Sequence, residues 1–189
     1  MKKKSIIIIA VIAVAVILIG SVIGSYNGLV ESREGVEQSQ SEISNQLQRR
    51  ADLIPNFVAT VKGYSDYEQE TYTAVTQARA AVTGADTVTE QAEASAQLDS
   101  AIDIWVNAVT EAYPELKANE QYIALQTEHS GTENRIAQAR RDYNESAKEF
   151  NVEIKKFPRS IIAGIFGYDS YDYFEAADGT ESVPEVSFD

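Results

Sequence analysis

The sequence predicts an all-α protein: an antiparallel four-helix-bundle-like domain with long helices, preceded by an N-terminal transmembrane helix. Three observations lead to this prediction. Residues 6–23 carry no charge, apolar residues recur every three or four positions along most of the chain, and the 189 residues include only four prolines and ten glycines. Steps of three and four residues mark one face of an α-helix, whereas strands alternate every second residue.

Residues 1–25 are expected to be a membrane anchor. A helix over residues 6–23 spans about 27 Å at about 1.5 Å per residue, close to the thickness of the hydrocarbon core. The alternative is a cleaved secretory signal, whose apolar stretch is usually shorter, about 7–15 residues. We favour the retained anchor, with the bilayer as its partner along residues 6–23, including Ile6, Ile9, Val14, Ile17, Ile19 and Ile23.

The charges around this stretch predict its orientation. Lys2, Lys3 and Lys4 precede it, and the first basic residue after it is Arg33. Because basic residues favour the cytoplasmic side, we expect a single-pass protein of the cell membrane with a cytoplasmic N-terminus and an extracytoplasmic bundle. The acidic body is expected to stand off anionic headgroups.

Residues 26–167 are expected to form the helical bundle. An apolar seam begins at Tyr26, keeps its spacing to Tyr64 and continues in alanine-rich form to about Val82, before a break at residues 83–85. Within this seam, Pro55 fits two readings. Either a new helix starts with Asp52 as its cap and Pro55 in its first turn, or one helix kinks at Pro55 and continues.

Two more helices complete the predicted bundle. The first begins at Thr87, where Thr87 and Glu90 have the spacing of a capping box, and it ends near Pro114. The last runs from about Lys117 to Phe157. It carries a seam residue at every seventh position, in the series Tyr122, His129, Ile136, Tyr143, Phe150 and Phe157. Burying these seams against one another gives an antiparallel bundle.

Residues 168–189 are expected to be an acidic, aromatic tail with a disordered end. From Asp169 onward there are seven acidic residues and no basic ones, and few apolar residues to offset the entropy of ordering. Just before the tail, an apolar turn is expected to dock on the bundle through Ile161, Ile162, Ile165 and Phe166. The aromatic residues that follow either pack on the bundle or form a docking strip for another protein: Tyr168, Tyr171, Tyr173 and Phe174.

Composition excludes several kinds of site. The chain has no cysteine, so it can form neither disulfides nor thiolate metal sites. Its single histidine, His129, rules out a multi-histidine metal site, including the di-iron centre of some bundles, which needs Glu-x-x-His on two helices. A net charge of −13 argues against nucleic acid as a partner, because phosphate binding needs clustered basic residues. We expect no cofactor.

Five stretches resemble the LemA family of bacterial membrane-anchored helical proteins. They are YNGLVESREGV, SEISNQLQRRADLIPNFVATVKGY, EAYPELKA, TENRIAQARRDYNESAKEFN, and FP followed by GYDSYDYFEA, in matching order over roughly Tyr26 to Glu175. The resemblance implies a membrane segment followed by a four-helix bundle. It implies no settled enzymatic activity, since most members are of unknown function and some are associated with magnetosome formation. The family more usually has leucine at His129, which weakens a catalytic role for this residue.

A set of residues coincides with these stretches: Arg49, Arg50, Asp52, Pro55, Asn56, Lys62, Glu133, Asn134, Arg135, Arg140, Tyr143 and Asn144. Arg50 and Glu133 fall at or next to seam positions, so we expect them to pair across two helices and set their register. A partner-binding surface is the alternative. No nucleophile and base stand at a useful spacing, so we expect no enzymatic activity.

The predicted function is therefore a membrane-tethered scaffold or adaptor that presents a bundle surface to protein partners or to a second copy. The alternative is a ligand-binding or enzymatic domain with a polar site between helices. A scaffold predicts a filled core, whereas the alternative predicts a pocket lined by several of these polar residues.

Overall fold

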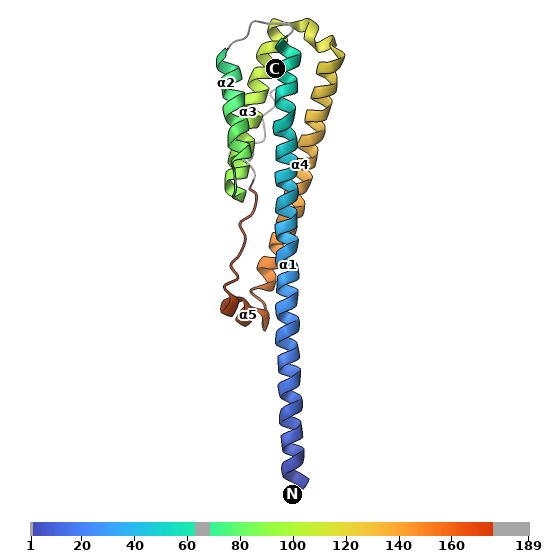
Figure 1. The fold of residues 1–189 in the computed structure, drawn as a ribbon, viewed down its shortest axis with the longest axis vertical. Coiled ribbons are helices and arrows are strands. Elements are labelled where there is room, and N and C mark those ends of the chain that lie inside the picture. The colour runs from blue at the N-terminus through green and yellow to red at the C-terminus, as the bar shows by residue number, and fades with distance from the viewer. Residues whose placement is uncertain (1, 63–68, 176–189) are drawn as a thin grey trace, which may run out of the picture. The chain divides into compact units, whose positions relative to one another are not determined.

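A computed structural model describes residues 2–62 and 69–175, and all regular secondary structure in these ranges is helical. The order is α1 (Lys2–Lys62), α2 (Gln69–Thr83), α3 (Val88–Ala112), the 3-10 helix η1 (Pro114–Ala118), α4 (Glu120–Glu153) and α5 (Arg159–Phe166) (Figure 1). The all-α class is confirmed. The predicted disordered end of the tail lies outside the described residues.

Helix α1 passes through Pro55 without a break, so the reading in which a new helix starts at Asp52 is wrong. A proline in a helix interior has no N–H to donate to the carbonyl four residues earlier, which here belongs to Ala51. Arg79 of α2 supplies the missing donor, with its Nε 2.8 Å from the Ala51 oxygen. Pro55 therefore leaves a backbone acceptor open on α1, and α2 docks on it.

The first helix does not continue to Val82, as the alanine-rich seam predicted. Helix α1 ends at Lys62, and α2 begins at Gln69 and runs in the opposite direction (Figure 1). The intervening sequence contains Gly63, Ser65 and Asp66, which favour turns. Because apolar residues continue at steps of three and four beyond this sequence, the end of the helix was not predicted.

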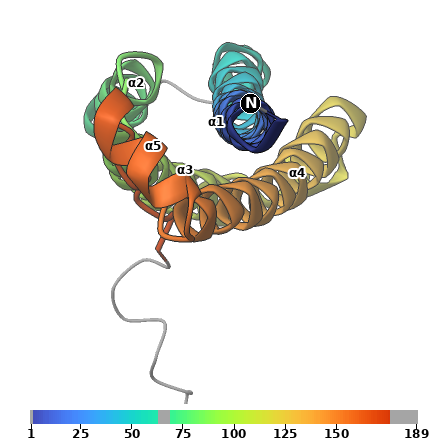
Figure 2. The same ribbon diagram turned by 90° about the horizontal axis from the view of Figure 1, so that it is seen from below.

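One compact unit contains residues 39–143 and 172–189 and holds the four-helix bundle. Within it α1, α2, α3 and α4 alternate in direction, and α1 lies on the concave side of the arc that α2, α3 and α4 form when seen end-on (Figure 2). At the centre, the Phe57 ring meets Trp105 and Tyr122 edge to face, with centroids 6.4 Å apart in both pairs. Other buried side chains come from all four helices: Ile43, Leu47, Ile54, Val75, Val82, Leu98, Ile102 and Ile136.

The start of α3 is the predicted capping box. The Thr87 hydroxyl accepts from the Glu90 N–H at 3.2 Å, and the Glu90 carboxylate accepts from the Thr87 N–H at 3.0 Å. Together these bonds satisfy two backbone donors at the helix start. Helix α3 ends at Ala112, and Pro114 opens η1, close to the predicted end.

Helix α4 is shorter at both ends than predicted. Lys117 belongs to η1, and α4 ends at Glu153, ahead of Phe157. The seven-residue series is buried from Tyr122 to Phe150, but Phe157 is 82 % exposed. Phe157 continues the seven-residue spacing of the seam, but α4 ends at Glu153, so Phe157 does not lie on the buried face of that helix.

The second compact unit contains residues 1–38 and 144–171, and it holds the start of α1, the end of α4 and all of α5. Its core is formed by Leu29, Val36, Ala147, Phe150, Ile154, Ile162 and Ala163. Of the four residues expected to dock as an apolar turn, only Ile162 is buried, while Ile161, Ile165 and Phe166 are exposed. The prediction of four docked residues was wrong because α5 turns only one side towards its own unit.

The start of α1 is long and apolar enough to cross a membrane. Its apolar side chains are exposed on every side, including those named above as lipid-facing: Ile6, Ile9, Val14, Ile17, Ile19 and Ile23. Nothing within the second unit covers them.

The contact between Ala51 and Arg79 gives a testable prediction. Replacing Arg79 with Met leaves the Ala51 oxygen without its donor, which should lower the free energy of unfolding by about 1–3 kcal/mol. In a Pro55→Ala background the helix regains its own N–H donor, so the same replacement should cost much less. Denaturant unfolding of the four variants in detergent measures this coupling. Arg49→Met is the matched control, and equal costs for Arg79→Met in both backgrounds would contradict the account.

Candidate functional site

Arg50 is the centre of the polar set predicted from the sequence. It lies on α1, and its side chain is only 2 % exposed. Its Nη2 contacts the Asp99 carboxylate of α3 and donates to Oε1 of Glu133 on α4 at 3.2 Å. Burial lowers the pKa of Arg50, and the Glu133 charge acts in the opposite direction. One guanidinium therefore joins three helices, and the expected pair with Glu133 is present.

His129 lies one turn before Glu133 on α4 and packs into the core. Its Nε2 is 3.2 Å from Oε1 of Glu133, and its ring meets the Phe57 ring edge to face at 6.0 Å. Burial lowers the pKa of His129, and the positive charge of Arg50 adds to this effect. This shift favours the neutral form of the ring, whose Nε2 faces the Glu133 carboxylate. This contact gives the histidine a packing role in the seam.

A second group of charges lies at the bundle surface. Arg49 pairs with Glu128 at 2.6 Å, and Arg135 approaches the same carboxylate at 3.3 Å. The bond from Arg49 is the main reason that the pKa of Glu128 is lowered. Because these side chains are largely exposed, the pairs contribute little to stability.

Asp52 has no capping role, since it lies inside α1. Its carboxylate accepts from Gln48 at 2.9 Å and lies 3.7 Å from Arg79. Of the remaining predicted residues, Pro55, Asn56 and Asn134 are exposed. Lys62 closes α1, but its side chain lies outside the described part of the structure. Among the described side chains, the contacts of Arg50 are to Asp99 and Glu133 and include none of these residues.

Arg140 and Tyr143 bind the segment that follows α5. The Tyr143 hydroxyl donates to the Asp172 carbonyl at 3.0 Å, and its ring meets Phe174 edge to face at 5.4 Å. The Arg140 guanidinium lies over the Phe174 ring, 5.4 Å from the ring centre. Burial lowers the pKa of Arg140. These residues hold a chain segment in place.

In the unit formed by residues 1–38 and 144–171, the tail aromatics pack against α4. Tyr168 and Tyr171 meet the Phe150 ring at 6.0 and 5.3 Å. Asn151 binds the Tyr171 backbone in both directions: its amide donates to the carbonyl at 2.8 Å, and its oxygen accepts from the N–H at 2.8 Å. Asn144, also predicted, is half-buried in this unit.

Tyr168, Tyr171 and Phe174 thus pack against other residues of the protein, which favours the packing interpretation over a free docking strip. Phe174 is buried, and Tyr168 and Tyr171 are half-buried, whereas Tyr173 is exposed. Sequence reasoning missed Asn151 and Asp99. Asn151 lies at the end of the family-like stretch TENRIAQARRDYNESAKEFN, which was its only signal, and Asp99 lies outside all of those stretches.

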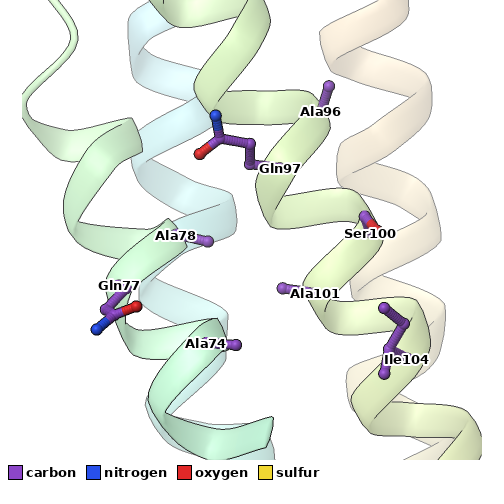
Figure 3. Close-up of a pocket in the computed structure, with 8 residues that line it drawn as sticks. All are labelled: Ala74, Gln77, Ala78, Ala96, Gln97, Ser100, Ala101 and Ile104. Carbon is purple, nitrogen blue, oxygen red and sulfur yellow. The ribbon is translucent and has the colours of Figure 1, made fainter.

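A shallow groove of about 580 Å³ lies between α2 and α3 (Figure 3). Its lining is uncharged and rich in small residues: Ala74, Gln77, Ala78, Ala96, Gln97, Ser100, Ala101 and Ile104. None of the polar residues predicted as a site lines it. Among the described residues, no three His, Asp or Glu side chains gather in a way that would hold a metal ion.

Comparisons with known proteins show sequence similarity to one family. The sequence model of the LemA family matches residues 39–188. Protein LemA of Metamycoplasma hominis is 29 % identical over 157 residues, which cover 82 % of this chain and 71 % of that protein. Magnetosome protein MamQ 2 of Paramagnetospirillum magneticum is 38 % identical over 68 residues, 36 % of this chain and 25 % of its own length. Magnetosome protein MamQ of Magnetospirillum gryphiswaldense is 33 % identical over 82 residues, which cover 42 % of this chain and only 30 % of that protein.

The Arg50 contacts predict strong coupling between α1 and α4. Glu133→Gln leaves the buried Arg50 guanidinium with Asp99 as its one charged partner. Arg50→Met removes the buried positive charge with which Glu133 pairs. We therefore expect Glu133→Gln to cost almost nothing in the Arg50→Met background, giving a coupling of about 1–3 kcal/mol in a double-mutant cycle. Glu149→Gln, elsewhere on α4, should cost the same in both backgrounds. Additive losses from Arg50 and Glu133 would remove the register role.

His129 predicts a pH dependence of stability. Its folded pKa lies below the ordinary value of 6.5, so the unfolded chain takes up a proton first as the pH falls. The free energy of unfolding should thus be highest above about pH 6.5 and fall towards pH 5. His129→Leu should flatten this part of the curve, measured by denaturant unfolding at each pH.

Tyr122→Phe is the control for the histidine variant, because Tyr122 meets the same Phe57 ring and burial raises its pKa further from this range. Its curve between pH 6.5 and 5 should keep the slope of the unmodified protein. An unchanged slope in His129→Leu would show that the histidine is not the titrating group.

Proposed function

The chain belongs to the LemA family, and on that premise we propose that it is a membrane-anchored scaffold whose helical bundle offers its surface to protein partners. The observation that carries this proposal is the use made of the polar residues. Arg50, Glu133, Arg140 and Tyr143 bind other parts of the same chain, and the described groove contains none of them. These contacts give the four residues a structural role within the chain.

The anchoring part of the proposal is supported by the start of α1. An exposed apolar helix of this length is costly in water, because each buried CH₂ group is worth about 0.8 kcal/mol when removed from it. A bilayer supplies the missing environment, with about 20 apolar residues needed to span it. The three lysines before the span favour a cytoplasmic N-terminus in a bacterial cell membrane, with the bundle outside.

The groove between α2 and α3 offers a surface that suits a protein partner. Its alanines allow another backbone to approach closely, and its two glutamines offer hydrogen bonds without a charge that must be neutralised (Figure 3). An uncharged, shallow surface suits an extended contact with a helix rather than the enclosure of a small polar molecule. A site for a small polar molecule would place several ionisable groups around the groove.

A pair of photo-crosslinking variants tests the scaffold role. Ala96, in the groove, and Ala137, on α4, are both exposed alanines within helices. With a photoreactive amino acid at either position in the full-length protein in its own membrane, we expect discrete protein adducts from position 96 and few or none from position 137. Mass spectrometry of the adducts separates a second copy from another protein. Equal labelling at both positions, or no adduct at position 96, would contradict the proposed surface.

A further inference from the structure

We propose that α5 is a membrane-surface helix, whose exposed apolar side enters the headgroup layer next to the point where α1 leaves the bilayer. This inference rests on the proposed anchoring of α1. All of its parts belong to the compact unit of residues 1–38 and 144–171, so its geometry depends on that unit alone.

The first observation is apolar surface that this unit leaves uncovered. Ile161 is 56 % exposed, Ile165 is 72 % exposed and Phe166 is 56 % exposed, while Ile162 and Ala163 point inward. The chain from Ser160 to Tyr168 carries no charged residue. Phe157, just before the helix, adds a further exposed aromatic ring. Contiguous apolar surface of this kind marks a protein or membrane contact.

The second observation is the distance of α5 from the span. The Phe166 ring lies 4.7 Å from the Tyr26 ring, centre to centre. Tyr26 follows Ile23, the last apolar residue of the uncharged stretch, by three residues, or about 4.5 Å along the helix axis. The headgroup layer extends roughly 5–7 Å beyond the hydrocarbon core on each side. Both aromatic rings therefore fall at the level where aromatic side chains are enriched in membrane proteins.

The third observation is that α5 is fixed against α1 at its other end too. The Arg159 guanidinium lies over Gly28, where an added Cβ would stand 2.7 Å from Nη2 of the arginine. The same side chain pairs with Glu153 at the end of α4. Two contacts on α1, at Tyr26 and Gly28, thus hold α5 beside the span (Figure 1). The helix needs little affinity of its own, because the anchor already keeps it at the bilayer.

Charge is the fourth observation, and it selects lipid as the occupant. Between Glu153 and Asp169 the chain has three basic residues, Lys155, Lys156 and Arg159, and no acidic one. In a protein of net charge −13 this is a local reversal of sign, placed directly before the exposed apolar face. Basic residues near the surface of an anionic bilayer are each attracted to it, and they commonly flank interfacial helices. Under this proposal the segment is an exception to the expectation that the acidic body stands off the membrane.

The absence of cysteine makes a direct test possible. Single variants Ile165→Cys, Ile17→Cys and Glu145→Cys are labelled with the environment-sensitive fluorophore NBD, and the full-length protein is reconstituted into phosphatidylcholine–phosphatidylglycerol vesicles. A share of the lipid carries bromine on its acyl chains, which quenches fluorophores within the bilayer. Glu145 is exposed on α4, eight residues before its end and so about 12 Å farther along the helix, and it serves as the aqueous control.

We expect brominated lipid to reduce emission about twofold at position 165, since interfacial helices bury their apolar side about 5–10 Å deep, and to leave position 145 unchanged. Position 17 reports the anchor itself. Quenching at 17 without quenching at 165 would overturn the inference while leaving the anchoring proposal intact. No quenching at 17 would overturn both. A blue-shifted but unquenched label at 165 would show that protein, such as a second copy, covers α5 instead of lipid.

Discussion

The architecture of the bundle depends on one buried charge. Arg50 is held in the apolar interior of the bundle, where the cost of removing an ion from water is several kcal/mol unless partners of opposite charge are close by. Those partners, Asp99 and Glu133, come from two other helices. A shift of either helix by one residue would turn its carboxylate away by about 100° and leave the guanidinium unpaired. This pairing favours one register of α1, α3 and α4, and apolar packing fills the space that remains.

The same logic places α2, although there the group that must be satisfied is a backbone carbonyl. Pro55 deprives Ala51 of its helical donor, and buried backbone acceptors are almost always paired. The bond from Arg79 answers this requirement across helices. Two arginines thus position the helices around α1. Arg50 is a buried ion that requires carboxylates nearby, and Arg79 is a donor to the open Ala51 carbonyl. These two needs explain why a proline and polar residues stand close together between Arg49 and Pro55.

Local patterns in the sequence predicted what local energetics determine. The capping box at Thr87 and the buried seam from Tyr122 to Phe150 follow from spacing alone, and both are present. Spacing did not predict the end of α1 at Lys62, because alanines continue the seam into α2 without marking the change of direction. Nor did it single out Asp99 or Arg79, whose roles exist only once other helices lie beside them. The pairing of Arg50 with Glu133 was accessible because both residues interrupt apolar seams, whereas Asp99 lies among other polar residues of α3.

The order of charges along the end of the chain agrees with a membrane-side position for α5. After α4 the chain first carries three basic residues. The apolar part of α5 follows, next to Tyr26 of α1, and acidic residues begin only at Asp169. By Tyr171 the backbone is already bound to Asn151, two residues before the end of α4, and Phe174 lies against Tyr143, a further two helical turns back along α4. A chain that placed these acids directly after α4 would set them against the headgroups, whereas in this order the basic residues come first.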